Sequence, residues 1–88
     1  MTNHPNRGKS QSAARNPRPA EVVAARERVQ KAREIGITEA QTWCARQVHT
    51  TVRVWQQWEA PESSDSHRRM HPAMWHLFRI LVSGKIDA

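Results

Sequence analysis

Residues 36–59 read GITEAQTWCARQVHTTVRVWQQWE, and this stretch decides the predicted fold. Two sets of apolar side chains follow each other in it at helical spacing: Cys44, Ala45 and Val48, then Val52, Trp55 and Trp58. Spacings of three and four residues place each set on one helix face. Thr38 is a suitable N-cap for a helix over residues 39–48, and a second helix is expected over residues 50–59. Only a tight turn fits between them, so the stretch predicts a helix-turn-helix.

The sequence before this stretch predicts one longer helix. Pro19 suits a first helical turn because its φ angle is fixed, and Glu21 is favourable there beside the positive end of the helix dipole. A single apolar face contains Val22, Ala25, Val29 and Ala32. Four basic residues lie off that face: Arg26, Arg28, Lys31 and Arg33. Gly36 is expected to end the helix, because glycine readily forms a helix C-cap.

The sequence after the stretch predicts a loop and a last helix. Residues 60–69, APESSDSHRR, are rich in proline, serine and charge, and Pro72 suits a helix start. The apolar side chains of the last helix cover more than one face and are Met74, Trp75, Leu77, Phe78, Leu81 and Val82. Such a helix needs more than one neighbour. No segment alternates with the period of a strand, so the predicted fold is an all-α bundle of about four helices.

Positive charge is concentrated at the N-terminus. The 88 residues hold 14 Lys and Arg against 8 Asp and Glu, a formal net charge of +6. Residues 1–18 include Arg7, Lys9, Arg15 and Arg18 and no acidic side chain. They show no apolar periodicity, so we expect a flexible basic arm, disordered when free, followed by one domain over residues 19–88. The arm is either a solubilising tail or a segment that touches DNA.

Several classes of protein are excluded by simple absences from the sequence. No apolar run reaches the ~20 residues of a membrane helix, and the N-terminus lacks the apolar part of a signal peptide. Cys44, the one cysteine, lies at an inward position, where a thiol is usually inert. The sequence contains no group of residues at metal-ligand spacing, no glycine-rich phosphate loop and no paired carboxylates. We therefore expect a cytoplasmic protein that is not an enzyme and uses no cofactor, metal or small-molecule substrate.

Residues 36–59 resemble the helix-turn-helix of Xre/Cro-type transcriptional regulators. The positions that carry the resemblance are Gln41, Ala45, Val48, Trp55, Trp58 and Glu59. The strings RVWQQWEA (53–60) and RRMHPAMWHLFRI (68–80) resemble a subgroup of small regulators from phages and other mobile elements. His49 stands in the turn where these proteins often have glycine, at a position that can require a positive φ angle.

The resemblance implies a lambda repressor-like bundle that binds double-stranded DNA in a bacterial cell. It would bind an inverted-repeat operator as a homodimer and repress its own promoter or operon. The subgroup implies an origin in a phage or other mobile element, where some regulators of this kind accompany anti-CRISPR genes.

Candidate site residues follow from the helix faces. The expected base readers are Arg53 first and Gln57 second, with Thr51, Val52 and Gln56 beside them, because such side chains recognise base edges in the major groove. The expected phosphate contacts are Gln41, Thr50, Arg68 and Arg69, with Arg15 and Arg18 from the arm. The expected dimer interface consists of Trp75, Phe78, Leu81 and Val82 on the last helix.

A rival interpretation is a protein-interaction module, for example an antitoxin that neutralises a partner protein. The apolar last helix would then hold the partner instead of a second copy. The outward Thr51, Arg53 and Gln57 beside Gln41 favour DNA.

Overall fold

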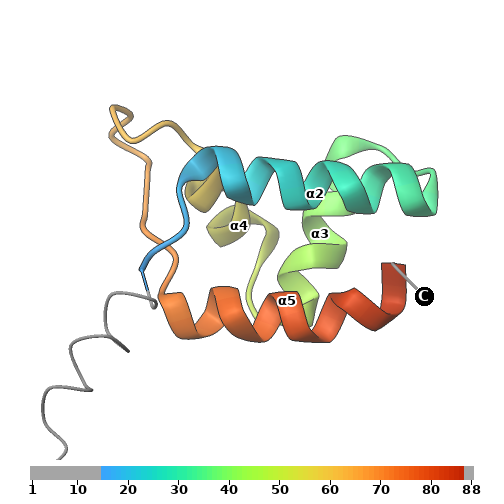
Figure 1. The fold of residues 1–88 in the computed structure, drawn as a ribbon. Coiled ribbons are helices and arrows are strands. Elements are labelled where there is room, and N and C mark those ends of the chain that lie inside the picture. Colours follow the sequence, from blue (N-terminus) through green and yellow to red (C-terminus); the bar gives the residue numbers. More distant parts are fainter. Residues whose placement is uncertain (1–14, 87–88) are drawn as a thin grey trace, which may run out of the picture.

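The chain is described by a computed structural model over residues 15–86, and within that range it contains helices and no strand. The helices are α2 (Pro19–Arg33), α3 (Ile37–Gln47), α4 (Val52–Glu59) and α5 (Pro72–Ile86). The all-α prediction is therefore confirmed. Figure 1 shows α2 and α5 as the two long helices at opposite edges of the view, with α3 and α4 between them.

The start of α2 is fixed by polar contacts in its first turn. Pro19 is the first helical residue, as predicted, and the Glu21 carboxylate accepts a hydrogen bond from the Arg18 backbone N–H at 2.8 Å. Arg15 donates two hydrogen bonds of 2.9 Å to the same carboxylate. These contacts, first the one from Arg15, lower the pKa of Glu21 from 4.5 to about 2.

Residues 15–18 of the predicted basic arm are part of the described structure. Besides the Arg15 contact, the side chain of Asn16 donates to the backbone oxygen of Met70 at 2.8 Å, and Pro17 is buried. The chain is thus attached to the helical domain from Arg15 onward. The rest of the predicted arm, residues 1–14, lies outside the described residues.

The connection from α2 to α3 corrects two predicted helix ends. Glu34 adopts the left-handed C-cap conformation, with φ 55° and ψ 51°, so Gly36 is not the residue that ends α2. Gly36 is instead the extended N-cap of α3, at φ −79°. Thr38 therefore lies within the first turn of α3 and is not its N-cap. Each observed cap lies two residues before the predicted one, because the local sequence alone does not show which of two nearby capping residues is used.

The turn between α3 and α4 has the predicted geometry. His49 adopts φ 59°, and the Thr50 backbone N–H donates to the Ala45 oxygen at 3.0 Å. Thr51 caps α4, because its hydroxyl oxygen accepts from the Val54 backbone N–H at 3.2 Å. The turn is short, and α4 packs against α3.

The segment between α4 and α5 folds back on the end of α4. The Arg68 backbone N–H donates to the Gln57 oxygen at 3.1 Å, and the His67 ring bonds to the Ala60 oxygen at 2.9 Å. No helix is present over residues 60–71, as predicted. The His71 ring then accepts from the Ala73 backbone N–H at the start of α5.

The core takes side chains from all four helices. Its buried apolar members are Val22, Val29, Ala40, Cys44, Ala45, Val48, Trp55, Trp58, Met70, Phe78 and Val82. Two predicted positions on α2 are corrected: Ala32 is exposed, whereas Arg26 is buried. A buried arginine requires a partner, and Glu59 supplies it from α4. Within residues 15–86 no helix has the length and apolar character needed to span a membrane.

Candidate nucleic-acid interface

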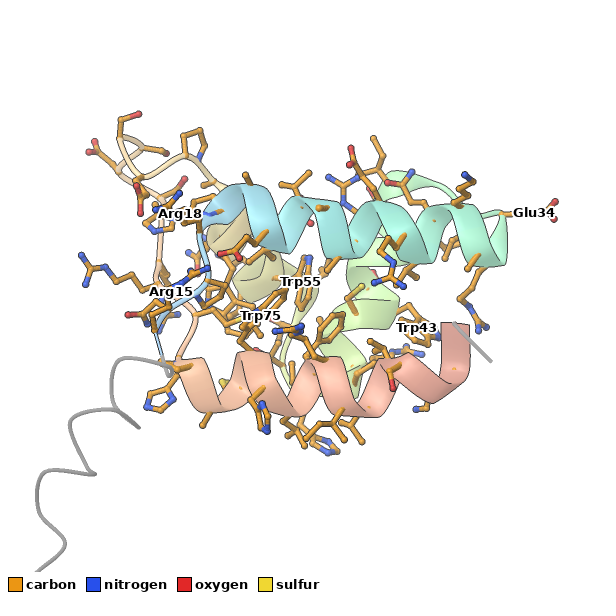
Figure 2. All side chains as sticks on the ribbon, viewed as in Figure 1. Arg15, Arg18, Glu34, Trp43, Trp55 and Trp75 are labelled. Carbon is orange, nitrogen blue, oxygen red and sulfur yellow. The ribbon has the colours of Figure 1, made fainter. Side chains whose placement is uncertain are left out.

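Helix α4 has two chemically different sides. Trp55 and Trp58 are buried, as predicted, and their rings meet edge to face at 5.6 Å. The Trp55 ring also packs on Phe78 of α5, with centroids 5.0 Å apart. Figure 2 shows Trp55 in the space between α2 and α5. This packing turns the opposite, polar side of α4 toward solvent.

The predicted base readers lie mostly on that polar side. Thr51, Arg53 and Gln56 are exposed, while Val52 and Gln57 are half-buried. Arg53, Gln56 and Gln57 line a shallow cavity of about 230 Å³ together with Ser66 from the following loop. Three of the five predicted readers are therefore brought together on one surface.

A buried polar network lies behind this surface. The Glu59 carboxylate accepts from Arg26 Nε at 3.0 Å and Nη2 at 2.9 Å, from Gln41 Nε2 at 3.0 Å and from Trp55 Nε1 at 2.7 Å. Arg26 also donates to the Gln30 side chain. The hydrogen bond to Glu59 raises the pKa of Arg26 further, against the effect of burial. The network ties α2, α3 and α4 to one carboxylate.

Gln41 corrects the sequence interpretation. It is the fifth residue of α3, and only 7% of its surface is exposed. Its amide bonds to Glu59 on one side and to Gln56 on the other, at 3.0 and 3.1 Å. A side chain enclosed in this way does not reach a phosphate. Its predicted role is therefore wrong, and it belongs to the network.

The burial of Arg26 and its pairing with Glu59 were not predicted from the sequence. The signal was present, because Arg26 follows Val22 by four residues and precedes Val29 by three, which places all three on one face. Charge alone had assigned Arg26 to the solvent side. A basic residue at core spacing, together with a lone acidic residue after two tryptophans, indicates a buried ion pair.

The other predicted phosphate contacts are in different surroundings. Arg68 and Arg69 are exposed after the loop, and neither is part of an ion pair within residues 15–86. Thr50 is half-buried, with its backbone N–H bonded inside the turn. Arg15 is occupied by Glu21, and Arg18 is exposed next to it (Figure 2). The positions most open to an anion are thus Arg18, Arg68 and Arg69.

Two residues of the predicted dimer interface are core residues. Phe78 is 1% exposed and Val82 is also buried, because the side of α5 that carries them packs on Trp55 and the rest of the core. Trp75 is half-buried and stacks on Phe78 at 5.9 Å, and Leu81 is half-buried. Among the described side chains of α5, the large apolar ones that are exposed are Leu77, at 42%, and Ile80, at 58%.

Trp43 is half-buried beside the end of α5 (Figure 2). The Arg33 guanidinium lies 5.1 Å from its ring centre and the Lys85 ammonium 6.0 Å from it. Cations over an indole face are attracted by its negative charge density. Trp43 thus links the end of α2 to the end of α5 through α3.

Within residues 15–86, the remaining titratable side chains form neither a metal-binding cluster nor a reactive thiol site. No three His, Cys, Asp or Glu side chains in that range are grouped closely enough to hold a metal ion. Burial, with a smaller contribution from Glu59, raises the pKa of the Cys44 thiol to about 12, so it stays protonated at neutral pH.

Comparisons of the chain with protein-family models, curated proteins and solved structures found no match.

Proposed function

We propose that the chain is a sequence-specific double-stranded DNA-binding protein that regulates transcription, with α3 and α4 as its helix-turn-helix. The observation that carries the proposal is that α4 has one buried and one exposed side. Trp55 and Trp58 are buried in the core. Thr51, Arg53 and Gln56 are exposed on the N-cap and first two turns of the helix. A recognition helix contacts base edges with residues of this part. The net charge of +6 suits a polyanionic partner.

The regulated promoter would be that of its own gene or operon, and the expected sign is repression by occupying the promoter. This part of the proposal rests on the resemblance of RVWQQWEA (53–60) and RRMHPAMWHLFRI (68–80) to small regulators of phages and other mobile elements.

Arg53 provides the direct test. Arg53→Ala removes one bidentate contact with guanine and should cost about 1–3 kcal/mol at the preferred site, with little loss on random DNA. Mobility shifts with the DNA upstream of the gene, and with a random duplex of equal length, measure both. Arg79→Ala, which removes a positive charge from α5, is the matched control. Equal losses on both duplexes for Arg53→Ala contradict its role as a reader.

We also propose a homodimer, with a corrected interface on the outer side of α5. The exposed positions Ala73, Leu77, Ile80 and Gly84 are spaced by four, three and four residues. This spacing is that of a coiled-coil seam, which a second copy of α5 could cover. Two copies would bring two α4 helices to two half-sites about 34 Å apart.

Ile80→Glu tests this interface without touching the core. The variant should remain folded, sediment as a monomer and bind an inverted repeat far more weakly, because the two half-sites are no longer linked. Ser83→Glu, exposed on α5 but outside the seam, is the control. A wild-type chain that sediments as a monomer near 10.2 kDa at high micromolar concentration contradicts a preformed dimer.

A protein-interaction module is the second candidate function, and one observation favours it. A groove of about 660 Å³ lies between α2 and α5 and is lined by Ala24, Ala25, Trp75 and Ile80, with Arg28 and Arg79. An amphipathic segment of a partner would fit such a surface. Sequence-specific DNA binding by the isolated chain decides for the first function.

A further inference from the structure

The hydrogen-bond network beneath α4 fixes the orientation of two amide side chains in succession. The first is Gln41, which faces the Glu59 carboxylate. A carboxylate in an ion pair with Arg26 only accepts hydrogen bonds, so Gln41 must turn its NH₂ group toward it, at 3.0 Å. The carbonyl oxygen of Gln41 then points away from Glu59.

The second amide is that of Gln56 on α4. Its Nε2 lies 3.1 Å from the Gln41 carbonyl oxygen and donates to it. A flipped Gln56 amide would place two carbonyl oxygens against each other, which is unfavourable. Glu59 therefore fixes the orientation of the Gln41 amide, and Gln41 in turn fixes the orientation of the Gln56 amide.

The exposed side of Gln56 is left with a defined pattern of donors and acceptors. One N–H is used by Gln41, and the Gln56 carbonyl oxygen makes no hydrogen bond within the described part of the chain. Gln56 is exposed and shares its cavity with Arg53. It can therefore offer an incoming ligand one acceptor and one donor side by side.

We infer that Gln56 reads adenine in the major groove and that Gln41 is the positioning residue that makes it do so. The inference rests on the proposed DNA-binding function. Adenine presents an N6 amino donor beside the N7 acceptor, which matches one acceptor and one donor. Guanine presents two acceptors, O6 and N7, and needs the two N–H groups that Gln56 no longer has free.

The consequence is a base preference that depends on a buried residue with no DNA contact of its own. A glutamine free to rotate its amide could satisfy several bases, whereas a fixed one discriminates. A bidentate pair of this kind discriminates by about 5- to 150-fold between the right and the wrong base.

The experiment selects binding sites for the wild-type chain from a randomised duplex library. It then measures affinities for the selected site with adenine or guanine at each position. Gln56→Ala should abolish the adenine preference at one position of each half-site. Gln41→Leu should reduce it to less than about threefold and leave affinity for random DNA unchanged within about twofold. Gln47→Ala, the same change at a glutamine of α3 that bonds to Trp43 and Lys85 and has no assigned DNA contact, should keep it.

A third variant does not depend on the core tolerating a substitution. Gln56→Glu has two oxygens and cannot donate to Gln41, so it offers DNA acceptors only. Its preference at that position should move from adenine to cytosine, which presents an amino donor without the N7 acceptor beside it. Circular dichroism and thermal melting establish that each variant is folded.

The outcomes separate this inference from the proposed function. A selected site whose adenine preference survives either Gln56→Ala or Gln56→Glu overturns the inference and leaves DNA binding intact. The same holds if folded Gln41→Leu keeps the full preference. A wild-type chain that retains no duplex at about 50 mM salt, where phosphate contacts are strong, overturns both.

Discussion

The contact of α2 with α4 and the contact of α4 with α5 meet at Trp55 but are built from different chemistry. Toward α2, the Trp55 indole N–H shares the Glu59 carboxylate with Arg26, whose side chain is only 10% exposed. Toward α5, the Trp55 ring packs on Phe78, and Trp75 stacks on Phe78. One contact is a directional polar network, and the other is apolar packing.

The two contacts contribute differently to the domain, one mainly to its stability and the other mainly to the orientation of α4. Apolar burial contributes free energy in proportion to area and tolerates small rotations. Hydrogen bonds to a buried carboxylate have fixed directions, and their loss leaves a buried group unsatisfied. We therefore expect α5 to hold the domain together and the Arg26–Glu59 network to set the angle at which α4 presents its polar side.

The largest expected loss of stability comes from the apolar contact. Phe78→Ala removes a ring that is 1% exposed and should lower the free energy of unfolding by about 3–5 kcal/mol. Ser83→Ala, at an exposed position of the same helix outside the proposed dimer seam, is the control and should change it by less than about 0.5 kcal/mol. Urea unfolding measures both. Similar losses would mean that α5 is not packed as described.

A slightly smaller loss is expected from breaking the polar contact. Arg26→Met leaves the Glu59 carboxylate, 8% exposed, without its ion-pair partner and should cost on the order of 3 kcal/mol. Adding Glu59→Gln removes the charge and keeps one acceptor oxygen for the Trp55 N–H, while Gln41 can turn its own amide oxygen toward the new NH₂ group, so the double variant should recover more than half of that loss.

Lys31→Met is the matched control for Arg26→Met, because it removes an exposed positive charge from the same helix. The two Arg26 variants would contradict the comparison if the double substitution were no more stable than the single one. That result would show that packing of the arginine stem, not its charge, is what matters at this position.

The smallest expected effect comes from the exposed ion pair at the start of α2, which lies outside both contacts. The pKa of Glu21 is lowered in the folded chain from 4.5 to about 2, first by Arg15 and then by the Arg18 backbone. Its contribution to stability is therefore complete above pH 4.5 and is lost as the pH falls through about 2. Solvent screens this exposed pair, so the effect is small.

Comparison of Glu21→Gln with the wild type checks the sign of this effect. The difference in unfolding free energy between the two should shrink as the pH is lowered from 4.5 toward 2. Glu62→Gln, at an exposed position in the loop before α5, is the control. A difference that grows toward low pH would mean that Glu21 is not stabilised as a carboxylate.

Features of this protein that depend only on neighbouring residues could be predicted from its sequence. Helical spacing predicted the burial of Trp55 and Trp58, proline predicted the start of α2, and the position of His49 in a tight turn anticipated its positive φ angle. It also placed Arg53 and Gln56 on the exposed side of α4, because that side lies opposite the tryptophans. Local geometry is sufficient for each of these conclusions.

Side chains whose hydrogen-bond partners lie far along the chain could be identified only once the helices were packed together. Arg26 and Glu59 are 33 residues apart, and a charged side chain is buried only where such a partner reaches it. The same network took Gln41 out of the predicted phosphate contacts and turned Gln56. Phe78 and Val82 became core residues because α5 packs on Trp55 with that side. Periodicity shows that a helix has an apolar side, but the packing of the helices decides which part of it is covered.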